Sequence, residues 1–296
     1  MKHAVAMTAY KDFAILHSSA RKLIANGADV FVHIDKKSAY TSAQIAALRD
    51  EGCRVTQRYN IPWAGYDHLR AIVDLLDEIV GTGEEYRYVH IISGQDYPVR
   101  RFGDAEELWD GTIYMKVISR DAFPENVESR IANRSVLYRF QTLGRLWNIA
   151  DKVSTFAQKA LGLRRLNLPS ETPLFKGEIW LSLPYRACKD LLTRPESRMI
   201  LSELRTTYIS EEFYFQTLVM NSEYADRVTP RNLRYTDWKS GRGRPAFLDE
   251  TDYEQILASG DIFARKISSD ISSNLLTLLE RNDPSRFMTE RVAQNF

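Results

Sequence analysis

The amino-acid sequence predicts an α/β domain built on a mostly parallel central sheet that is flanked by helices. Short apolar segments rich in β-branched residues recur in the first third of the chain, and amphipathic segments of helical length separate them. Strands that alternate with such helices form βαβ units, in which the strands run parallel. With 296 residues, the chain is long enough to bury a sizeable core in one domain.

The clearest elements lie in the first third of the chain. Buried strands are expected at His3–Met7, Ala28–Ile34 and Tyr88–Ile92, which are almost continuously apolar. Helices are expected at Phe13–Ala25 and Leu69–Val80, because apolar residues recur there every three or four positions. In open sheets of this kind ligands gather beyond the carboxyl ends of the strands, so the residues that follow each strand are the first candidates for a binding site.

The rest of the chain is less regular. A strand at Thr112–Ile118 precedes a poorly periodic stretch, 120–163, which we interpret as an excursion over one face of the domain. Regular elements then resume, with a strand at Glu178–Leu183 and helices that begin near Pro184, Pro195 and Ser210. The last patterned elements are a helix near Asp252–Ala258, the segment Asp261–Ser268 and a terminal helix around Leu275–Leu279.

Composition argues against several classes of protein. The chain has 40 Lys and Arg against 39 Asp and Glu, so its net charge of +1 gives no general attraction to nucleic acid. Every apolar run is shorter than the roughly 20 residues of a membrane span. The first strand begins at His3 and leaves no room for a secretory signal, so we expect a cytoplasmic protein without a transmembrane segment. Cys53 and Cys188 are expected to be buried thiols.

Metal binding is not expected. The chain contains no Asp-x-Asp sequence, and its five histidines form no closely spaced pair. His33 and His90 lie inside apolar strands, where a histidine is more often a core or wall residue than a ligand. Two cysteines are too few for the usual structural zinc site.

An acidic pair at the start of a helix is the sharpest local feature. Ser210 precedes Glu211 and Glu212, and an apolar stripe follows. Acidic residues in a first turn stabilise the helix dipole, so ordinary capping explains the pair without any catalytic role. A carboxylate at this position can also act as a general base if a cleft lies above it.

Two basic segments could hold phosphate groups. Trp238–Pro245 contains Arg242 and Arg244 between glycines, and Phe263–Lys266 ends in an Arg-Lys pair. Guanidinium and ammonium groups match phosphate oxygens, although a solvated basic loop is an equally good interpretation. The sequence has neither a P-loop nor a GxGxxG after the first strand, and an RNA-binding interpretation lacks the aromatic residues of a single-strand binder.

Several segments, in order and with consistent spacing over residues 3–270, carry a resemblance to a known family. They are His33-Ile34-Asp35-Lys36-Lys37-Ser38, Trp63-Ala64-Gly65 with Leu69, Ile92-Ser93-Gly94-Gln95-Asp96-Tyr97-Pro98, Thr172-Pro173-Leu174-Phe175-Lys176-Gly177, Ser210-Glu211-Glu212 with Thr217, and Phe263-Ala264-Arg265-Lys266. Together they resemble the core-2/I-branching enzymes, glycosyltransferase family 14, which also contains the peptide O-xylosyltransferases. The resemblance implies a GT-A type fold without the usual Asp-x-Asp metal motif.

The resemblance also implies a reaction: inverting transfer of GlcNAc or xylose from a UDP-sugar to a glycan hydroxyl, as in a β-1,6-N-acetylglucosaminyltransferase, without a metal or other cofactor. It assigns Glu212 as the base that takes the acceptor proton, with Glu211 as its capping neighbour and a substrate-binding residue. Lys266 and an arginine of the basic loop would stabilise the leaving diphosphate. Arg242 and Arg244 both flank the matching position, and we favour Arg244.

Other site residues follow from the same resemblance. Thr8, Tyr10 and Asp35 would form the nucleotide-binding edge. Asp96 would shape the donor or acceptor pocket, and Trp238 would stack on an acceptor sugar, although a core aromatic is an equal alternative. Three arginines of the irregular stretch could contact the acceptor without individual assignment: Arg130, Arg134 and Arg139.

The resemblance implies one catalytic domain at 1–270, with a nucleotide-binding half at 1–118, an acceptor- and diphosphate-binding half at 119–270, and a helix and tail at 271–296. The family's animal members carry a membrane anchor, a stem and many disulfides, none of which this sequence has. We therefore expect a bacterial type that acts on a surface glycan or its lipid-linked precursor, with peripheral contact at the inner membrane. The alternatives are a non-catalytic nucleotide- or sugar-binding protein on the same fold, and a sugar nucleotidyltransferase, which would need a Gly-rich first loop and metal-binding carboxylates.

Overall fold

A seven-stranded sheet forms the centre of the computed structural model, which describes residues 1–132, 145–163, 166, 168–169, 171–241 and 245–281. Its strands follow the order β10-β6-β9-β4-β1-β2-β3. They are β1 (His3–Ala9), β2 (Ala28–Ile34), β3 (Arg54–Thr56), β4 (Tyr88–Ser93), β6 (Ile113–Tyr114), β9 (Leu181–Pro184) and β10 (Val228–Thr229). Only β9 runs antiparallel to its neighbours, so the predicted mostly parallel α/β sheet is confirmed and is consistent with a GT-A-like fold.

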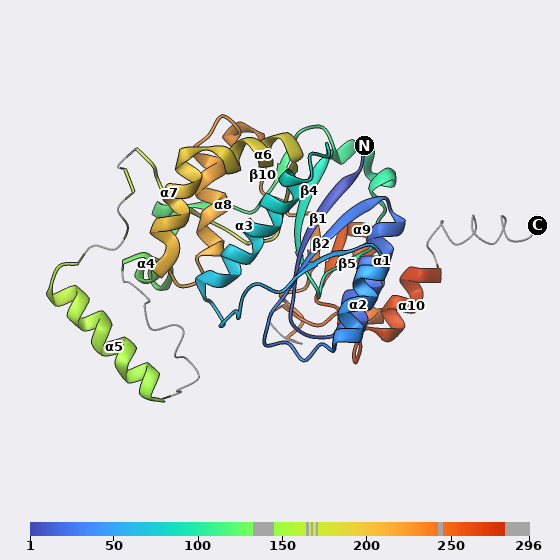
Figure 1. Cartoon of the computed structure of the whole chain (residues 1–296), viewed down its shortest axis with the longest axis horizontal. Helices are drawn as coiled ribbons and strands as arrows, with labels where there is room; N and C mark the ends of the chain where they lie inside the picture. The colour runs from blue at the N-terminus through green and yellow to red at the C-terminus, as the bar shows by residue number, and fades with distance from the viewer. Residues whose placement is uncertain (133–144, 164–165, 167, 170, 242–244, 282–296) are drawn as a thin grey trace, which may run out of the picture.

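Helices cover both faces of this sheet (Figure 1). One face carries α1 (Phe13–Ala25) and α2 (Ser42–Asp50); the other carries α3 (Tyr66–Gly81), α6 (Tyr185–Thr193), α7 (Pro195–Glu203) and α8 (Glu211–Met220). Alternate residues of β1 therefore pack in different cores: Ala4 and Ala6 join the α3 side, and Val5 and Met7 join the α1 side. Burial on both faces explains why the first strands are apolar without alternation.

The predicted strand at Thr112–Ile118 is two short strands in the structure. After β6 the chain leaves the central sheet, and β7 (Ile118–Ser119) pairs with β8 (Phe175–Lys176) in a separate two-stranded sheet. A continuous apolar stretch in the sequence does not reveal where a strand changes partners. The exchange matters for the site, because β8 carries a cation, Lys176, toward the start of α8.

A three-stranded sheet brings the end of the chain back to β4. Its order is β11 (Arg234–Thr236), β12 (Phe263–Arg265) and β5 (Tyr97–Pro98). Because β5 follows β4 almost directly, β12 is held beside the carboxyl edge of the central sheet. The basic segment around Arg265 and Lys266 therefore reaches the edge where a ligand is expected.

The remaining helices lie outside these layers: α4 (Glu125–Ala132), α5 (Arg145–Ala160), α9 (Tyr253–Ser259) and α10 (Ser273–Arg281). Figure 1 shows α5 set apart from the body, in the excursion between β7 and β8. Within the described residues, no helix has the length and apolar composition needed to cross a bilayer.

Candidate active site

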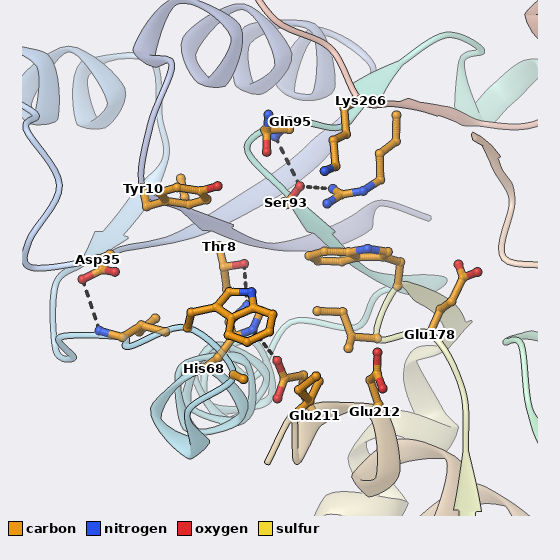
Figure 2. Close-up of a pocket in the computed structure, with 18 of the residues that line it drawn as sticks. Thr8, Tyr10, Asp35, His68, Ser93, Gln95, Glu178, Glu211, Glu212 and Lys266 are labelled. Carbon is orange, nitrogen blue, oxygen red and sulfur yellow. Dashed lines mark hydrogen bonds and ion pairs between the residues drawn. The ribbon is translucent and has the colours of Figure 1, made fainter. Parts of the chain in front are cut away.

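A pocket of about 610 Å³ opens at the carboxyl ends of β1, β2 and β4, where the sheet rule places a ligand (Figure 2). The start of α8 closes one side, and the segment after β12 closes another. Seven of the predicted site residues line it: Thr8, Tyr10, Asp35, Glu211, Glu212, Trp238 and Lys266. Residues more than 200 positions apart in sequence therefore share one cavity, while Arg242 and Arg244 lie outside the described residues, as do Arg134 and Arg139.

Two cations hold the Glu212 carboxylate. Arg130 Nη1, from α4, lies 2.9 Å from Oε2 of Glu212, and Lys176 Nζ, from β8, lies 3.1 Å from the same oxygen. In the described part of the chain, no hydrogen bond or ion pair engages Oε1. About a quarter of the Glu212 side chain is exposed, so this oxygen is left for a ligand in the pocket.

The backbone beside Glu212 depends on a glycine. Gly177 donates its N–H to the Glu212 carbonyl at 2.8 Å, which ties the segment after β8 to the start of α8. A Cβ atom on Gly177 would lie 1.7 Å from the carbonyl oxygen of Lys116 and 3.0 Å from the Gln216 side chain. Only glycine permits this close approach, and the approach carries Lys176 to the carboxylate.

Glu211 begins a chain of polar contacts across the pocket. Its Oε1 lies 3.0 Å from Nδ1 of His68, at the start of α3, and Nε2 of the same imidazole lies 3.1 Å from Thr8 Oγ1 at the end of β1. Figure 2 shows the three side chains in line. Glu211 is 5% exposed, and its Oε2 has no hydrogen-bond partner among the described residues. The two adjacent glutamates thus have different surroundings, because Glu211 contacts an imidazole whereas Glu212 contacts two cations.

Asp96 lies beneath the pocket and does not line it. Its side chain is fully buried, pairs with Arg234 through Oδ1 and contacts Arg265 through Oδ2 at 3.0 Å. Ser93 adds a backbone N–H at 2.7 Å and a hydroxyl at 2.6 Å. Burial alone would raise the pKa of this carboxyl, but the two guanidinium groups and Ser93 outweigh it and lower the pKa below its ordinary value. Asp96 therefore shapes the pocket by holding Arg265, without reaching a ligand itself.

The basic side of the pocket is formed by Arg265 and Lys266. The Arg265 guanidinium lies 4.6 Å from the ring centroid of Trp180, and the ammonium of Lys266 lies 5.8 Å from that of Phe247. Burial and the neighbouring cations Arg265 and Lys11 lower the pKa of Lys266. Positive charge is thus concentrated, with partial desolvation, where an anionic group of a ligand could be bound.

Asp35 organises the opposite side. Its Oδ1 accepts the backbone N–H groups of Lys37 at 3.1 Å and Ile61 at 3.2 Å, so it fixes the loop that carries Trp63. The Asp35 side chain is almost fully buried, while Trp63 and Trp238 are 70% and 52% exposed. Trp238 is therefore not a core aromatic, and its exposed ring lines the pocket.

Sequence reasoning did not assign four residues that shape the site. His68, Lys176, Trp180 and Arg265 all contact a pocket side chain or line the cavity. Lys176 and Arg265 lie inside segments that carry the family resemblance, so they could have been singled out there. Nothing in the sequence pairs His68 with Glu211. No group of three or more His, Cys, Asp or Glu side chains within the described residues could hold a metal ion.

Comparisons with known proteins agree with this arrangement of motifs. The profile of the Core-2/I-branching enzymes matches residues 25–258. The chain is similar to a xylosyltransferase of Ciona intestinalis (21% identity), xylosyltransferase 2 of Rattus norvegicus (23%) and the xylosyltransferase oxt of Drosophila melanogaster (18%). These matches cover 72%, 84% and 90% of the chain, which spans 24%, 30% and 31% of the respective relatives.

Proposed function

The chain belongs to the Core-2/I-branching enzyme family, and from this premise we propose that it is an inverting, metal-independent glycosyltransferase that uses a UDP-sugar. The transferred sugar is GlcNAc or xylose, and the acceptor is a glycan hydroxyl. The names of the relatives favour xylose, whereas the family resemblance of the sequence motifs allows either sugar. The acceptor class is a bacterial surface glycan or its lipid-linked precursor, reached from the cytoplasmic side.

The position of Glu212 carries this proposal. In an inverting displacement the acceptor oxygen attacks the anomeric carbon while the bond to UDP breaks, and a base on the acceptor side takes the hydroxyl proton. Glu212 lines the pocket with one oxygen held by Arg130 and Lys176, so the other can accept that proton. The two cations fix the carboxylate and can also donate hydrogen bonds to acceptor hydroxyls.

The basic side of the pocket is suited to the leaving group. UDP leaves with negative charge that must be stabilised as the bond breaks, and a fixed cation can supply this when no divalent ion is used. Lys266 lines the pocket opposite Glu212, and Arg265 is anchored behind it by Asp96. Thr8, Tyr10 and Asp35 at the strand ends complete the proposed nucleotide site, with Arg242 or Arg244 as a further diphosphate ligand.

Exposed aromatic rings favour a sugar acceptor. Trp63 and Trp238 are both more than half exposed and line the pocket together with Trp180. Flat apolar faces next to charged groups suit a ligand with both C–H faces and hydroxyls. The different-class alternative is a protein that binds a nucleotide or sugar without transferring it, and such a protein would not need Glu212.

Glu212→Gln tests the proposal, with Glu211→Gln as its matched neighbour. Removing a general base lowers turnover by about 100- to 10,000-fold, and we expect UDP affinity to stay nearly unchanged. Transfer from UDP-GlcNAc and UDP-xylose, with and without EDTA, would be measured beside UDP binding by calorimetry. Glu211→Gln should retain far more activity, because its carboxylate contacts His68 and is nearly buried.

The outcomes separate the alternatives. Full activity in Glu212→Gln removes the proposed base, and loss in Glu211→Gln alone assigns the role to its neighbour. UDP binding without transfer to any acceptor favours the non-catalytic protein. Activity that disappears with EDTA and returns with a divalent ion contradicts the metal-independent mechanism.

A further inference from the structure

Exposed apolar side chains are concentrated on α5 and the residues that follow it. Ile149, Val153 and Phe156 are 61%, 62% and 75% exposed, and Leu161 and Leu163 are 71% and 53% exposed. These five are among twelve large hydrophobic residues with high exposure in the described part of the chain. Such concentration marks an interaction surface more often than chance exposure does.

The apolar residues of α5 form a stripe. Ile149, Val153 and Phe156 are spaced by four and then three residues, so they lie on one side of the helix. Ser154 and Gln158 lie on another side and are less exposed than the stripe. An ordinary surface helix turns its apolar side toward the core, but the stripe of α5 is exposed, and Figure 1 shows the helix set apart from the body.

The charges of this segment are almost entirely positive. Arg145, Lys152 and Lys159 recur every seven residues, which places all three positions along one flank of the apolar stripe. In residues 145–165 the sequence has five Lys and Arg against one acid, Asp151, a net charge of +4. The whole chain has a net charge of +1, so the cations are concentrated here.

We propose that α5 binds the surface of a bilayer containing anionic lipids, with its apolar stripe at the acyl boundary and its basic flank at the headgroups. An apolar stripe bordered by Lys and Arg in a helix of low overall hydrophobicity is the pattern of an interfacial helix. A second copy of the chain fits less well, because pairing two α5 stripes would bring together two segments that each have a net charge of +4. A partner protein would have to match both features with an acidic rim.

The position of α5 relates this surface to the pocket. The same excursion contains α4, whose Arg130 contacts Glu212. A membrane bound at α5 would therefore lie on the side of the molecule from which the acceptor end of the pocket is built. This consequence for a lipid-linked acceptor rests on the proposed function, whereas bilayer binding by α5 does not.

Vesicle cosedimentation of the full chain tests the proposal. We expect binding to vesicles of phosphatidylcholine with phosphatidylglycerol, weaker binding to phosphatidylcholine alone, and a decline as salt rises. The double substitution Ile149→Ser and Phe156→Ser should lower the vesicle partition coefficient at least about tenfold. Lys152→Glu should lower it at least about fivefold. The matched controls Leu257→Ser on α9 and Arg49→Glu on α2, both at exposed positions, should leave it unchanged.

Three results would overturn the proposal: no binding to anionic vesicles, equal binding to both vesicle types, or equal losses in the control variants. A dimer of the wild-type chain in solution that Ile149→Ser with Phe156→Ser converts to monomer would assign the stripe to a second copy. Circular dichroism at matched concentration verifies that each variant is folded. Glycosyl transfer to a soluble acceptor is measured in the same samples, and the α5 variants should retain this activity. The measurement therefore tests bilayer binding by α5 separately from the proposed transferase function.

Discussion

The two ends of the central strands both bury polar side chains, but in opposite electrostatic states. At the carboxyl end, beneath the pocket, the fully buried carboxylate of Asp96 pairs with Arg234 and contacts Arg265. Toward the amino end, His3 and His90 are buried among aromatic rings and bind each other, with Nδ1 and Nε2 separated by 2.9 Å. One cluster is ionic and faces a cavity, and the other is neutral and dry.

The ionic cluster carries charge to the pocket. Arg265 is held by Asp96 and Ser93 on one side and contacts the Trp180 ring on the other, so its position is fixed before any ligand arrives. Fixed charge of this kind stabilises a developing anion without reorganisation. Burying a carboxylate with two guanidinium groups costs desolvation energy, and a ligand-binding role accounts for that cost better than stability does.

The neutral cluster joins strands. His90 Nδ1 lies 2.8 Å from Ser182 Oγ on β9, so the histidine pair connects β1, β4 and β9. The His3 ring stacks on Phe102 with centroids 4.3 Å apart and meets Trp109 edge to face. Burial lowers the pKa of His3 to about 3, and burial with His3 and Arg234 nearby lowers that of His90 well below its ordinary value. Both histidines are core residues, which the sequence predicts for His90.

The largest expected difference comes from removing charge at the ionic end. Asp96→Asn leaves Arg234, which is fully buried, and Arg265 without their counter-ion, and breaking a buried pair in this way costs about 3–5 kcal/mol. Urea unfolding measures the loss. Asp104→Asn, in an exposed pair with Arg101, is the matched control and should cost at most about 1 kcal/mol. Similar losses in the two variants would mean that Arg234 and Arg265 do not depend on Asp96 as their counter-ion.

A second prediction separates the two ends by function. Lys266→Ala removes a charged hydrogen-bond donor from the pocket and should weaken UDP binding by about 1.5–3 kcal/mol, with little effect on unfolding. Ser182→Ala removes a partner of His90 and should cost about 1 kcal/mol of stability, with no effect on UDP binding. Calorimetry gives the UDP affinity of each variant, and urea unfolding gives its free energy of unfolding. If Ser182→Ala weakened UDP binding as much as Lys266→Ala does, the two ends would not be independent.

The sequence predicts the sheet and the pocket residues at the strand ends well. Buried parallel strands and amphipathic helices leave periodic patterns. Thr8 lies at the end of β1 and Asp35 directly follows β2, so sheet topology alone brings them together. Lys266 is far away in sequence, but it lines the same pocket, and its motif singles it out.

Contacts made by irregular segments are harder to predict. Lys176 reaches Glu212 only because β7 and β8 form a separate sheet and Gly177 allows a close approach. The strand predicted at Thr112–Ile118 concealed this exchange of partners. Asp96 lies in a pocket motif, yet its burial depends on Arg234, which is 138 positions away. A linear pattern predicts which residues gather at an edge but not which of them face the ligand.

The two ends are also expected to differ in their sensitivity to acid. Histidine in an unfolded chain has a pKa near 6.5, whereas burial lowers the pKa of His3 to about 3 and lowers that of His90 well below its ordinary value. Below pH 6.5 the unfolded state therefore binds more protons, and the free energy of unfolding falls by about 1.4 kcal/mol per pH unit for each such histidine.

The Asp96 cluster at the carboxyl end should lose its contribution to stability at a lower pH than the histidine cluster does. The pKa of Asp96 is lowered from an ordinary value of 3.8, so its stabilising contribution is complete above that pH and is lost only as the pH falls through its lower folded pKa. Urea unfolding from pH 7.5 to 4.0, with imidazole shifts followed by NMR, should then report the histidines with little contribution from Asp96. A free energy of unfolding that stays constant down to pH 4 would contradict the neutral, buried state of the histidine cluster. Signals of His3 or His90 that titrate near pH 6.5 in the folded protein would show that water reaches the cluster.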